Sequence, residues 1–213
     1  TEEDDKTEQA EKDITILVVE DNPDLRQFLF TILKTDYNVL LAENGKEGLV
    51  MARNKMPDFI LTDVTMPVMD GFELCKTIKS KLDYSHIPII LLTAKTNIQS
   101  KIEGMELGAD SYIEKPFSVQ YLEACIKNLL DLRNLLRQKF SKMPLVPLNS
   151  IANNSMDNKF LTRINEIIEQ NFSNSELSVD FLAEELCISR SGLFAKIKTL
   201  ANVTPNELIQ IVR

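Results

Sequence analysis

From residue 59 the sequence reads Phe59-Ile-Leu-Thr-Asp63-Val-Thr-Met-Pro-Val-Met-Asp-Gly71, a short apolar run that turns polar at an aspartate and then leads into a helical segment. Similar apolar runs recur on both sides of it, separated by segments of helical periodicity; they are Ile16-Leu-Val-Val19, Val39-Leu-Leu-Ala42, Ile89-Ile-Leu-Leu92 and Tyr112-Ile113. This alternation is typical of a parallel sheet covered by helices on both faces. The sequence therefore predicts an α/β fold with a doubly wound, five-stranded parallel sheet, a (βα)5 unit over residues 14–140.

The helical segments begin at residues that favour helix starts, namely Asn22 before Pro23, Asn44 before Gly45, Gly71, Asn97 and Ser118. The fifth helix should run from Ser118 towards Phe140, which is longer than a single domain needs. It is either an ordinary amphipathic helix or a rod that couples or dimerises the protein, and we slightly favour the rod.

The remaining chain divides by composition. Residues 1–13 carry seven carboxylates and predict a disordered acidic tether. Prolines and polar residues without periodicity predict a linker at 141–156, and helical periodicity without any strand returns over 157–213. We expect a small all-α domain there.

Composition excludes several classes of protein. The 213 residues are 44% hydrophobic and carry a net charge of -8, which fits a soluble protein and argues against binding nucleic acid by bulk charge. No apolar run is long enough to cross a membrane, so we expect a cytoplasmic fragment without membrane contact. Cys75, Cys125 and Cys187 fit neither a disulfide framework nor a zinc site and should be buried thiols, and the single histidine, His86, should lie in a loop.

Polar residues follow the predicted strands at their carboxyl ends: Glu20 and Asp21, Asp63, Thr93 and Lys115. Ligands of such sheets bind at this edge, so we expect these side chains to converge. Three carboxylates close together need a cation, and hard oxygen ligands suit Mg²⁺.

Chemical roles follow from that grouping. Asp63 is the candidate nucleophile, because a carboxylate can attack phosphorus in line to form an acyl phosphate. Asp21 would bind Mg²⁺, with Glu20 nearby or acting through water. Lys115 would offer a point charge to one phosphoryl oxygen and Thr93 a hydroxyl donor to another.

The chain resembles the response-regulator receiver family, with its flavodoxin-like fold, over about residues 14 to 135. Four motifs carry the resemblance: Val18-Val-Glu-Asp-Asn22, Leu61-Thr-Asp-Val-Thr-Met-Pro-Val-Met-Asp-Gly71, Leu91-Leu-Thr-Ala94 and Gly108-Ala-Asp-Ser-Tyr-Ile-Glu-Lys-Pro-Phe117. The resemblance implies that Asp63 is phosphorylated from the phosphohistidine of a partner histidine kinase. It also implies a backbone carbonyl of Thr65 as a metal ligand and a cis peptide before Pro116.

The resemblance implies that Thr93 moves onto the phosphoryl group while Tyr112 turns inwards. Phosphorylation would thereby shift the equilibrium between two conformations of the receiver. The other interpretation of Tyr112 is a half-buried strand aromatic, and the sequence gives the two equal weight. Glu20 stands where aspartate is at least as common.

Two rival interpretations of the site are disfavoured. An aspartyl-phosphate hydrolase or phosphotransferase usually needs a carboxylate two residues after the nucleophile, where this chain has Thr65, so we expect no enzyme activity. A receiver that only binds partners would lack Asp63, Lys115 or one of the acidic pair, and all are present.

The tail reads as a helix over Val179–Leu186, a tight turn, and a second helix over Arg190–Leu200. A generic three-helix unit has the same periodicity, so the pattern alone gives even odds. Beyond the pattern, the tail resembles the first half of an AraC-type helix-turn-helix domain; the likeness rests on Ser189, Leu193, Ile197-Lys198 and Val203-Thr-Pro-Asn206.

That resemblance implies a helix that enters the major groove of duplex DNA. The residues expected near bases are Arg190, Ser191, Phe194 and Ala195, with Lys196 or Lys198 near phosphate. Ala195 stands where the family often has a basic residue and Asn202 where it often has glycine. Residues 159–213 hold six basic and seven acidic side chains, and about half of such a domain is missing, so we expect weak or no specific DNA binding by this fragment.

The combination resembles the carboxyl-terminal part of hybrid two-component sensors, whose parent would be anchored in the inner membrane; a free-standing regulator is the other possible parent. The sequence therefore predicts a phosphorylation-controlled transcription regulator that could form a homodimer. The alternative is a phosphorelay receiver whose helical tail docks another protein.

Overall fold

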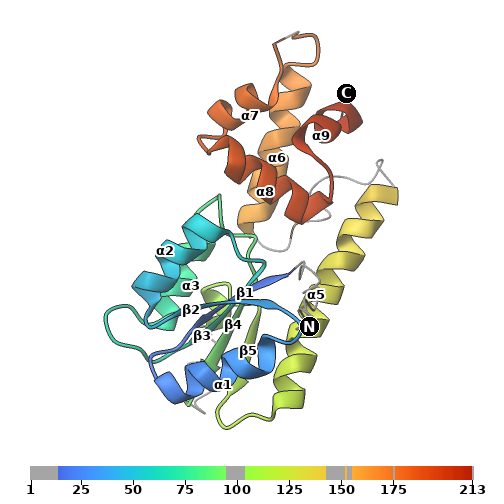
Figure 1. The fold of residues 1–213 in the computed structure, drawn as a ribbon. Helices are drawn as coiled ribbons and strands as arrows, with labels where there is room; N and C mark the ends of the chain where they lie inside the picture. Colours follow the sequence, from blue (N-terminus) through green and yellow to red (C-terminus); the bar gives the residue numbers. More distant parts are fainter. Residues whose placement is uncertain (1–13, 95–103, 143–151, 153–154, 175, 213) are drawn as a thin grey trace, which may run out of the picture.

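The computed structural model describes residues 14–94, 104–142, 152, 155–174 and 176–212. Its first part is built on a sheet whose strands are β1 (Thr15–Val19), β2 (Asn38–Ala42), β3 (Phe59–Asp63), β4 (Ile89–Thr93) and β5 (Ser111–Glu114). All pairs are parallel and the strand order is β2-β1-β3-β4-β5 (Figure 1). The predicted doubly wound sheet is confirmed.

Helices cover both faces of this sheet. Helices α2 (Gly45–Lys55) and α3 (Gly71–Lys79) pack on one face, and α1 (Pro23–Leu33) and α5 (Val119–Lys142) pack on the other. The fifth helix is as long as its periodicity predicts. The predicted cap Asn97 and the predicted acidic tether lie outside the described residues.

The first strand shows why its sequence is continuously apolar. Leu17 and Val19 belong to the core beneath α2 and α3, whereas Ile16 and Val18 belong to the core beneath α1 and α5. Successive side chains of a strand point to opposite faces, so a strand buried on both faces needs an apolar residue at every position.

Capping residues start the helices where the sequence predicts. The Asn22 side chain accepts hydrogen bonds from the backbone N–H groups of Asp24 and Leu25, and Asn44 does the same for Glu47. The Ser118 hydroxyl accepts from the N–H of Tyr121. At the third helix the cap is Asp70, one residue before the expected Gly71, because its carboxylate can accept from the N–H of Glu73.

The tail folds into helices α6 (Ser155–Gln170), α7 (Val179–Glu185), α8 (Arg190–Ala201) and α9 (Pro205–Val212), with no strand among its described residues. They enclose a core of their own, which includes Phe160, Ile164, Leu182 and Leu193. The all-helical tail is confirmed, with α6 beginning at Ser155 rather than at residue 157.

A tight turn joins α7 to α8. Cys187 has a positive φ of 53° there, and the Ser189 hydroxyl caps α8 by accepting from the N–H of Gly192. The expectation of buried thiols holds for Cys75 but is wrong for Cys187, which is exposed because it occupies this turn; Cys125 is half-buried. All three are free thiols.

His86 lies in the loop between α3 and β4, as expected, and is buried there. No helix in the described part of the chain is both long and apolar enough to cross a membrane.

Candidate functional site

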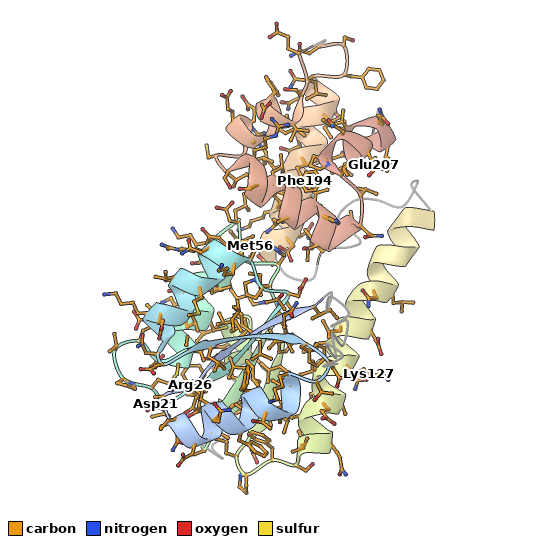
Figure 2. The ribbon with its side chains drawn as sticks, viewed as in Figure 1. Asp21, Arg26, Met56, Lys127, Phe194 and Glu207 are labelled. Carbon is orange, nitrogen blue, oxygen red and sulfur yellow. The ribbon has the colours of Figure 1, made fainter. Side chains whose placement is uncertain are left out.

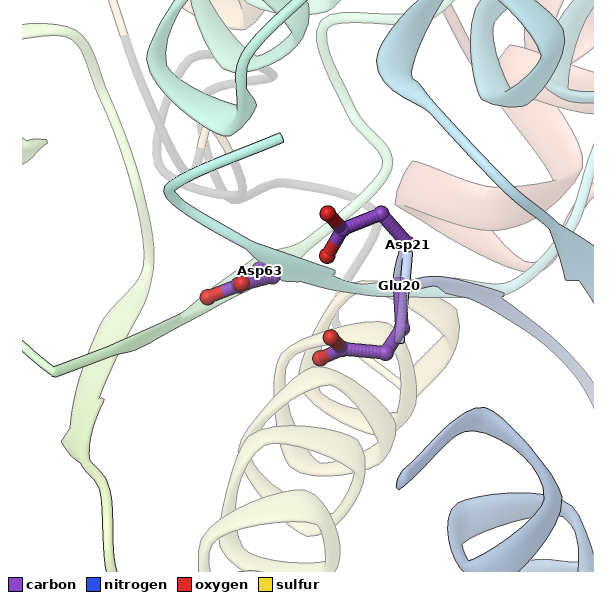
Figure 3. Close-up of side chains that lie close together, drawn as sticks. All are labelled: Glu20, Asp21 and Asp63. Carbon is purple, nitrogen blue, oxygen red and sulfur yellow. The ribbon is translucent and has the colours of Figure 1, made fainter. Parts of the chain in front are cut away.

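Three carboxylates meet at the carboxyl ends of β1 and β3, where the strand order reverses (Figure 3). One side-chain oxygen each from Glu20, Asp21 and Asp63 lies within 4.8 Å of the other two. Glu20 and Asp63 are buried and Asp21 is exposed. The structure thus brings together the three acidic residues that the sequence predicts.

Lys115 reaches this cluster from the end of β5. Its Nζ lies 2.8 Å from Oε2 of Glu20 and 3.0 Å from Oδ1 of Asp63. The peptide bond between Lys115 and Pro116 is cis, as the resemblance implies. One ammonium therefore offsets part of the negative charge of two buried carboxylates.

Burial controls the acidity of Glu20. Loss of solvent raises the pKa of this carboxyl above 4.5, and the hydrogen bond and charge of Lys115 act in the opposite direction. The nearby charge of Asp63 raises the Glu20 pKa further. A second cation at the cluster would stabilise the ionised form of Glu20.

Local backbone geometry fixes Asp63. The N–H of Val64 donates to Oδ1 of Asp63 at 2.8 Å, which orients the carboxylate. The chain then returns so closely that a Cβ on Gly71 would lie 2.1 Å from the backbone oxygen of Asp63. Glycine is therefore required where α3 begins, and Thr65 is exposed in the intervening turn.

Thr93 and Tyr112 lie on neighbouring strands. Thr93 is fully buried at the last position of β4, and the N–H of Lys115 donates to its carbonyl at 2.7 Å. Tyr112 is half-buried and packs against the core beneath α2 and α3, and its buried hydroxyl has no hydrogen-bond partner among the described residues. This position fits a half-buried strand aromatic and leaves its role in switching a prediction.

Sequence reasoning missed Arg26, which lies on the first turns of α1. Its Nη1 donates to the carbonyls of Glu20 at 2.8 Å and Asp21 at 3.3 Å, while its Nη2 pairs with Glu43 at 2.9 Å. Arg26 thus holds the backbone that carries the acidic pair. An arginine five residues after Asp21 was the signal, and it is a weak one because helix surfaces often carry arginine.

The residues predicted to face DNA lie on or next to the surface of α8, with one exception. Arg190, Ser191, Phe194 and Lys198 are exposed and Ala195 is half-buried, but Lys196 is 0% exposed. A phosphate contact by Lys196 does not fit this arrangement, because its ammonium is bound inside the protein. Arg190 is paired with Asp180 on α7 at 2.9 Å.

Comparison with known proteins agrees with this geometry. Residues 16–127 match the response regulator receiver domain family. The chain is 45% identical over 199 residues to "Histidine kinase P4" of Formosa agariphila, covering 93% of this chain and 14% of that protein's length. It is also 35% identical over 193 residues to the "Probable transcriptional regulator ycf27" of Cyanidium caldarium, covering 88% of this chain and 74% of that protein.

Solved structures resemble the first part of the chain. The signal receiver domain of a signal transduction histidine kinase from Syntrophus aciditrophicus superposes with a TM-score of 0.53 at 38% identity, over 55% of this chain and 90% of that one. The family match spans more than half of the chain, and the ycf27 relative is covered over more than two thirds of its length. The chain therefore belongs to the response regulator receiver family, whose shared receiver domain is a phosphoacceptor regulator rather than an enzyme.

Proposed function

We propose that Asp63 accepts a phosphoryl group from the phosphohistidine of a partner histidine kinase. An Asp63 oxygen would attack phosphorus in line, the bond from phosphorus to the imidazole nitrogen would break, and its electron pair would stay on that nitrogen. The observation that carries the proposal is the grouping of Asp63 with two further carboxylates and the ammonium of Lys115.

The donor atoms at this site fit a magnesium ion. Glu20, Asp21 and Asp63 supply carboxylate oxygens only, and Asp21 is open to solvent. These three residues, with the carbonyl of Thr65, would hold Mg²⁺, which when bound offsets the charge of the phosphoryl oxygens. Arg26 would keep the backbone of Glu20 and Asp21 in place for that purpose.

Lys115 and Thr93 would stabilise the phosphorylated state. The ammonium of Lys115 lies 3.0 Å from Oδ1 of Asp63 and needs only a small shift to contact a phosphoryl oxygen. Thr93 would donate its hydroxyl to another oxygen, and Tyr112 would follow this movement inwards. Gly104 packs beside the Tyr112 ring: a Cβ on this glycine would lie 3.4 Å from the ring.

For the whole protein we propose regulation of transcription. The division would be a tether over 1–13, a receiver over 14–140, a linker over 141–156 and a partial AraC-type helix-turn-helix domain over 157–213. Support comes from the capped helix α8 that follows a tight turn after α7, and from relatives named as transcriptional regulators. A docking module for another protein is the alternative for the tail. A chain extended past Arg213 that binds duplex DNA with salt dependence would favour the first function over the second.

The experiment for the receiver is intact-mass spectrometry after incubation with acetyl phosphate and Mg²⁺. We expect one phosphoryl adduct, lost in Asp63→Asn and after chelation of the metal. Asp70→Asn, a cap residue outside the cluster, is the matched control and should keep the adduct. An adduct that survives Asp63→Asn would show that another residue is the acceptor.

A further inference from the structure

The segment between α3 and β4, residues 80–88, contacts the helical tail. Leu82 in this segment packs against the hydrophobic core of the tail, and its carbonyl accepts a hydrogen bond from Nζ of Lys196 at 2.5 Å. The segment precedes β4, so it lies at the amino-terminal edge of the sheet, opposite the edge that holds Asp63. In Figure 2, Asp21 of the acidic cluster lies far from Phe194 on α8.

A buried polar cluster joins the two parts of the chain. Nζ of Lys196 on α8 lies 2.9 Å from Oδ1 of Asp157 on α6 and 2.7 Å from the hydroxyl of Ser85. Ser85 in turn donates to Asp157 at 3.0 Å. Lys196, Asp157 and Ser85 are all 0% exposed, and Lys196 also lies over the ring of Phe160 at 4.8 Å. Because Ser85 bonds to both charged residues, the ion pair of the tail is completed by the receiver.

Asp83 meets the first turn of α8. A Cβ on Gly192 would lie 3.2 Å from Oδ1 of Asp83, so the carboxylate rests against the backbone of this helix. That oxygen is buried and has no hydrogen-bond partner among the described residues. Burial raises the pKa of Asp83, and the charges of Lys196 and Lys81 oppose this. Oδ1 of Asp83 is therefore positioned by packing against the tail.

Hydrogen bonds and an ion pair within the receiver fix the conformation of this segment. The buried ammonium of Lys79 donates to the carbonyls of Ser85 at 3.4 Å and Ile87 at 2.9 Å, and it pairs with Asp110 at 2.6 Å. Asp110 also accepts from the N–H of Ile89 at the start of β4. A segment fixed in this way loses little freedom on contact, which favours docking.

We infer that residues 80–88 are a docking surface for helices α6 and α8 of the same chain, fastened by Lys196. In the docked state the Lys196 ammonium is fully engaged, and Asp83 places a negative charge at the amino-terminal turn of α8. Helix amino termini attract anions, but the Asp83 carboxylate already occupies this position and would repel a nucleic-acid phosphate there. Docking and contact of this turn with a polyanion therefore compete. The inference stands on the contact itself and needs neither phosphorylation of Asp63 nor DNA binding.

The test places a second ammonium at the contact from the receiver side. Ser85→Lys sets a new cation beside Lys196 in a site with no exposed surface, so the tail should leave the docking surface. We expect a larger radius of gyration by X-ray scattering and about tenfold faster hydrogen exchange in peptides covering residues 80–88. Exchange in the core of α6 should stay slow, because the tail has its own core. Thr31→Lys, which places a lysine at an exposed position of α1 outside residues 80–88, should leave both readouts as in the wild type.

A second variant separates undocking from unfolding of the receiver. Asp83→Lys changes a side chain that is only partly buried, and it reverses the charge facing α8. It should give the same larger radius with an unchanged circular dichroism spectrum. If both variants stay compact with wild-type exchange, the docking surface is ruled out. A larger radius with a doubled mass in light scattering would also overturn the inference, since the helices would then dock on a second copy.

Discussion

Lys196 carries a charge at a position with no exposed surface. Burial lowers the pKa of this lysine below 10.5, although the charge of Asp157 and its hydrogen bond act to raise it. A lysine whose folded-state pKa lies below its unfolded value binds its proton less tightly in the folded protein. The ammonium therefore costs stability at neutral pH, and this cost is relieved as the pH rises towards 10.5.

Removing Lys196 alone should lower the free energy of unfolding more than removing Lys196, Asp157 and Ser85 together. Lys196→Met leaves the carboxylate of Asp157 buried without its ammonium, and such a loss typically destabilises by roughly 3–5 kcal/mol. Adding Asp157→Leu and Ser85→Ala removes the stranded polar groups and should restore most of that loss. Chemical denaturation followed by circular dichroism measures both variants.

Lys198→Met is the control, because this lysine is exposed on the same helix and should change stability by about 0.5 kcal/mol or less. A triple variant as unstable as Lys196→Met alone would contradict this account, since the cost would then lie in the lost lysine stem and not in the stranded carboxylate. In the triple variant the stability gained on raising the pH towards 10.5 should disappear.

At the scale of an element, the end of α8 explains one departure from the AraC pattern. Asn202 ends the helix with φ 56° and ψ 27°, and its N–H donates to the carbonyl of Lys198. Glycine is the commonest residue in this left-handed conformation, and asparagine is the side chain that tolerates it best. Asn202 thus keeps the backbone geometry that a glycine would give.

Asn202→Val should therefore destabilise the tail by about 1–2 kcal/mol, because a β-branched residue is strained in the left-handed region. Asn202→Gly should change the free energy of unfolding by only a few tenths of a kcal/mol relative to the wild type. Thermal unfolding compares them with Asn158→Val, which makes the same change on an exposed position of α6. Equal losses in the two valine variants would mean that helix propensity, and not the backbone angle, sets the effect.

Elements could be predicted from the sequence where the signal is local. The five strands, the caps at Asn22, Asn44 and Ser118, and the long α5 depend on neighbouring residues, and each was found. The convergence of the acidic residues followed from strand ends that share one edge. The burial of Lys196 could not be predicted in this way, because Ser85 and Leu82 lie 111 and 114 residues away in the chain. A lysine on an amphipathic helix reads as a surface residue until the partner that covers it is known.

At the scale of the whole molecule, one short strand connects the docking surface with the predicted phosphorylation site. Strand β4 starts at Ile89, directly after the docking surface, and ends at Thr93 beside the predicted phosphorylation site. Its neighbour β5 starts next to Asp110, which binds Lys79 beneath the docking surface, and leads to Lys115. Helices pack against both faces of the sheet that contains β4 and β5. A displacement at one end of these strands is therefore transmitted to the other end and not absorbed by loose packing.

Phosphorylation should therefore weaken the docking of the helical tail on residues 80–88. If Thr93 and Lys115 move onto a phosphoryl group on Asp63, the ends of β4 and β5 shift and the contacts of residues 80–88 with α8 weaken. We expect faster hydrogen exchange in this segment when acetyl phosphate and Mg²⁺ are added, and no change in Asp63→Asn. Thr93→Ala should still take up the phosphoryl group but lose the change in exchange, because the hydroxyl that pulls β4 is absent. An adduct that forms on the wild type without altering exchange at residues 80–88 would show that the two ends of the sheet act independently.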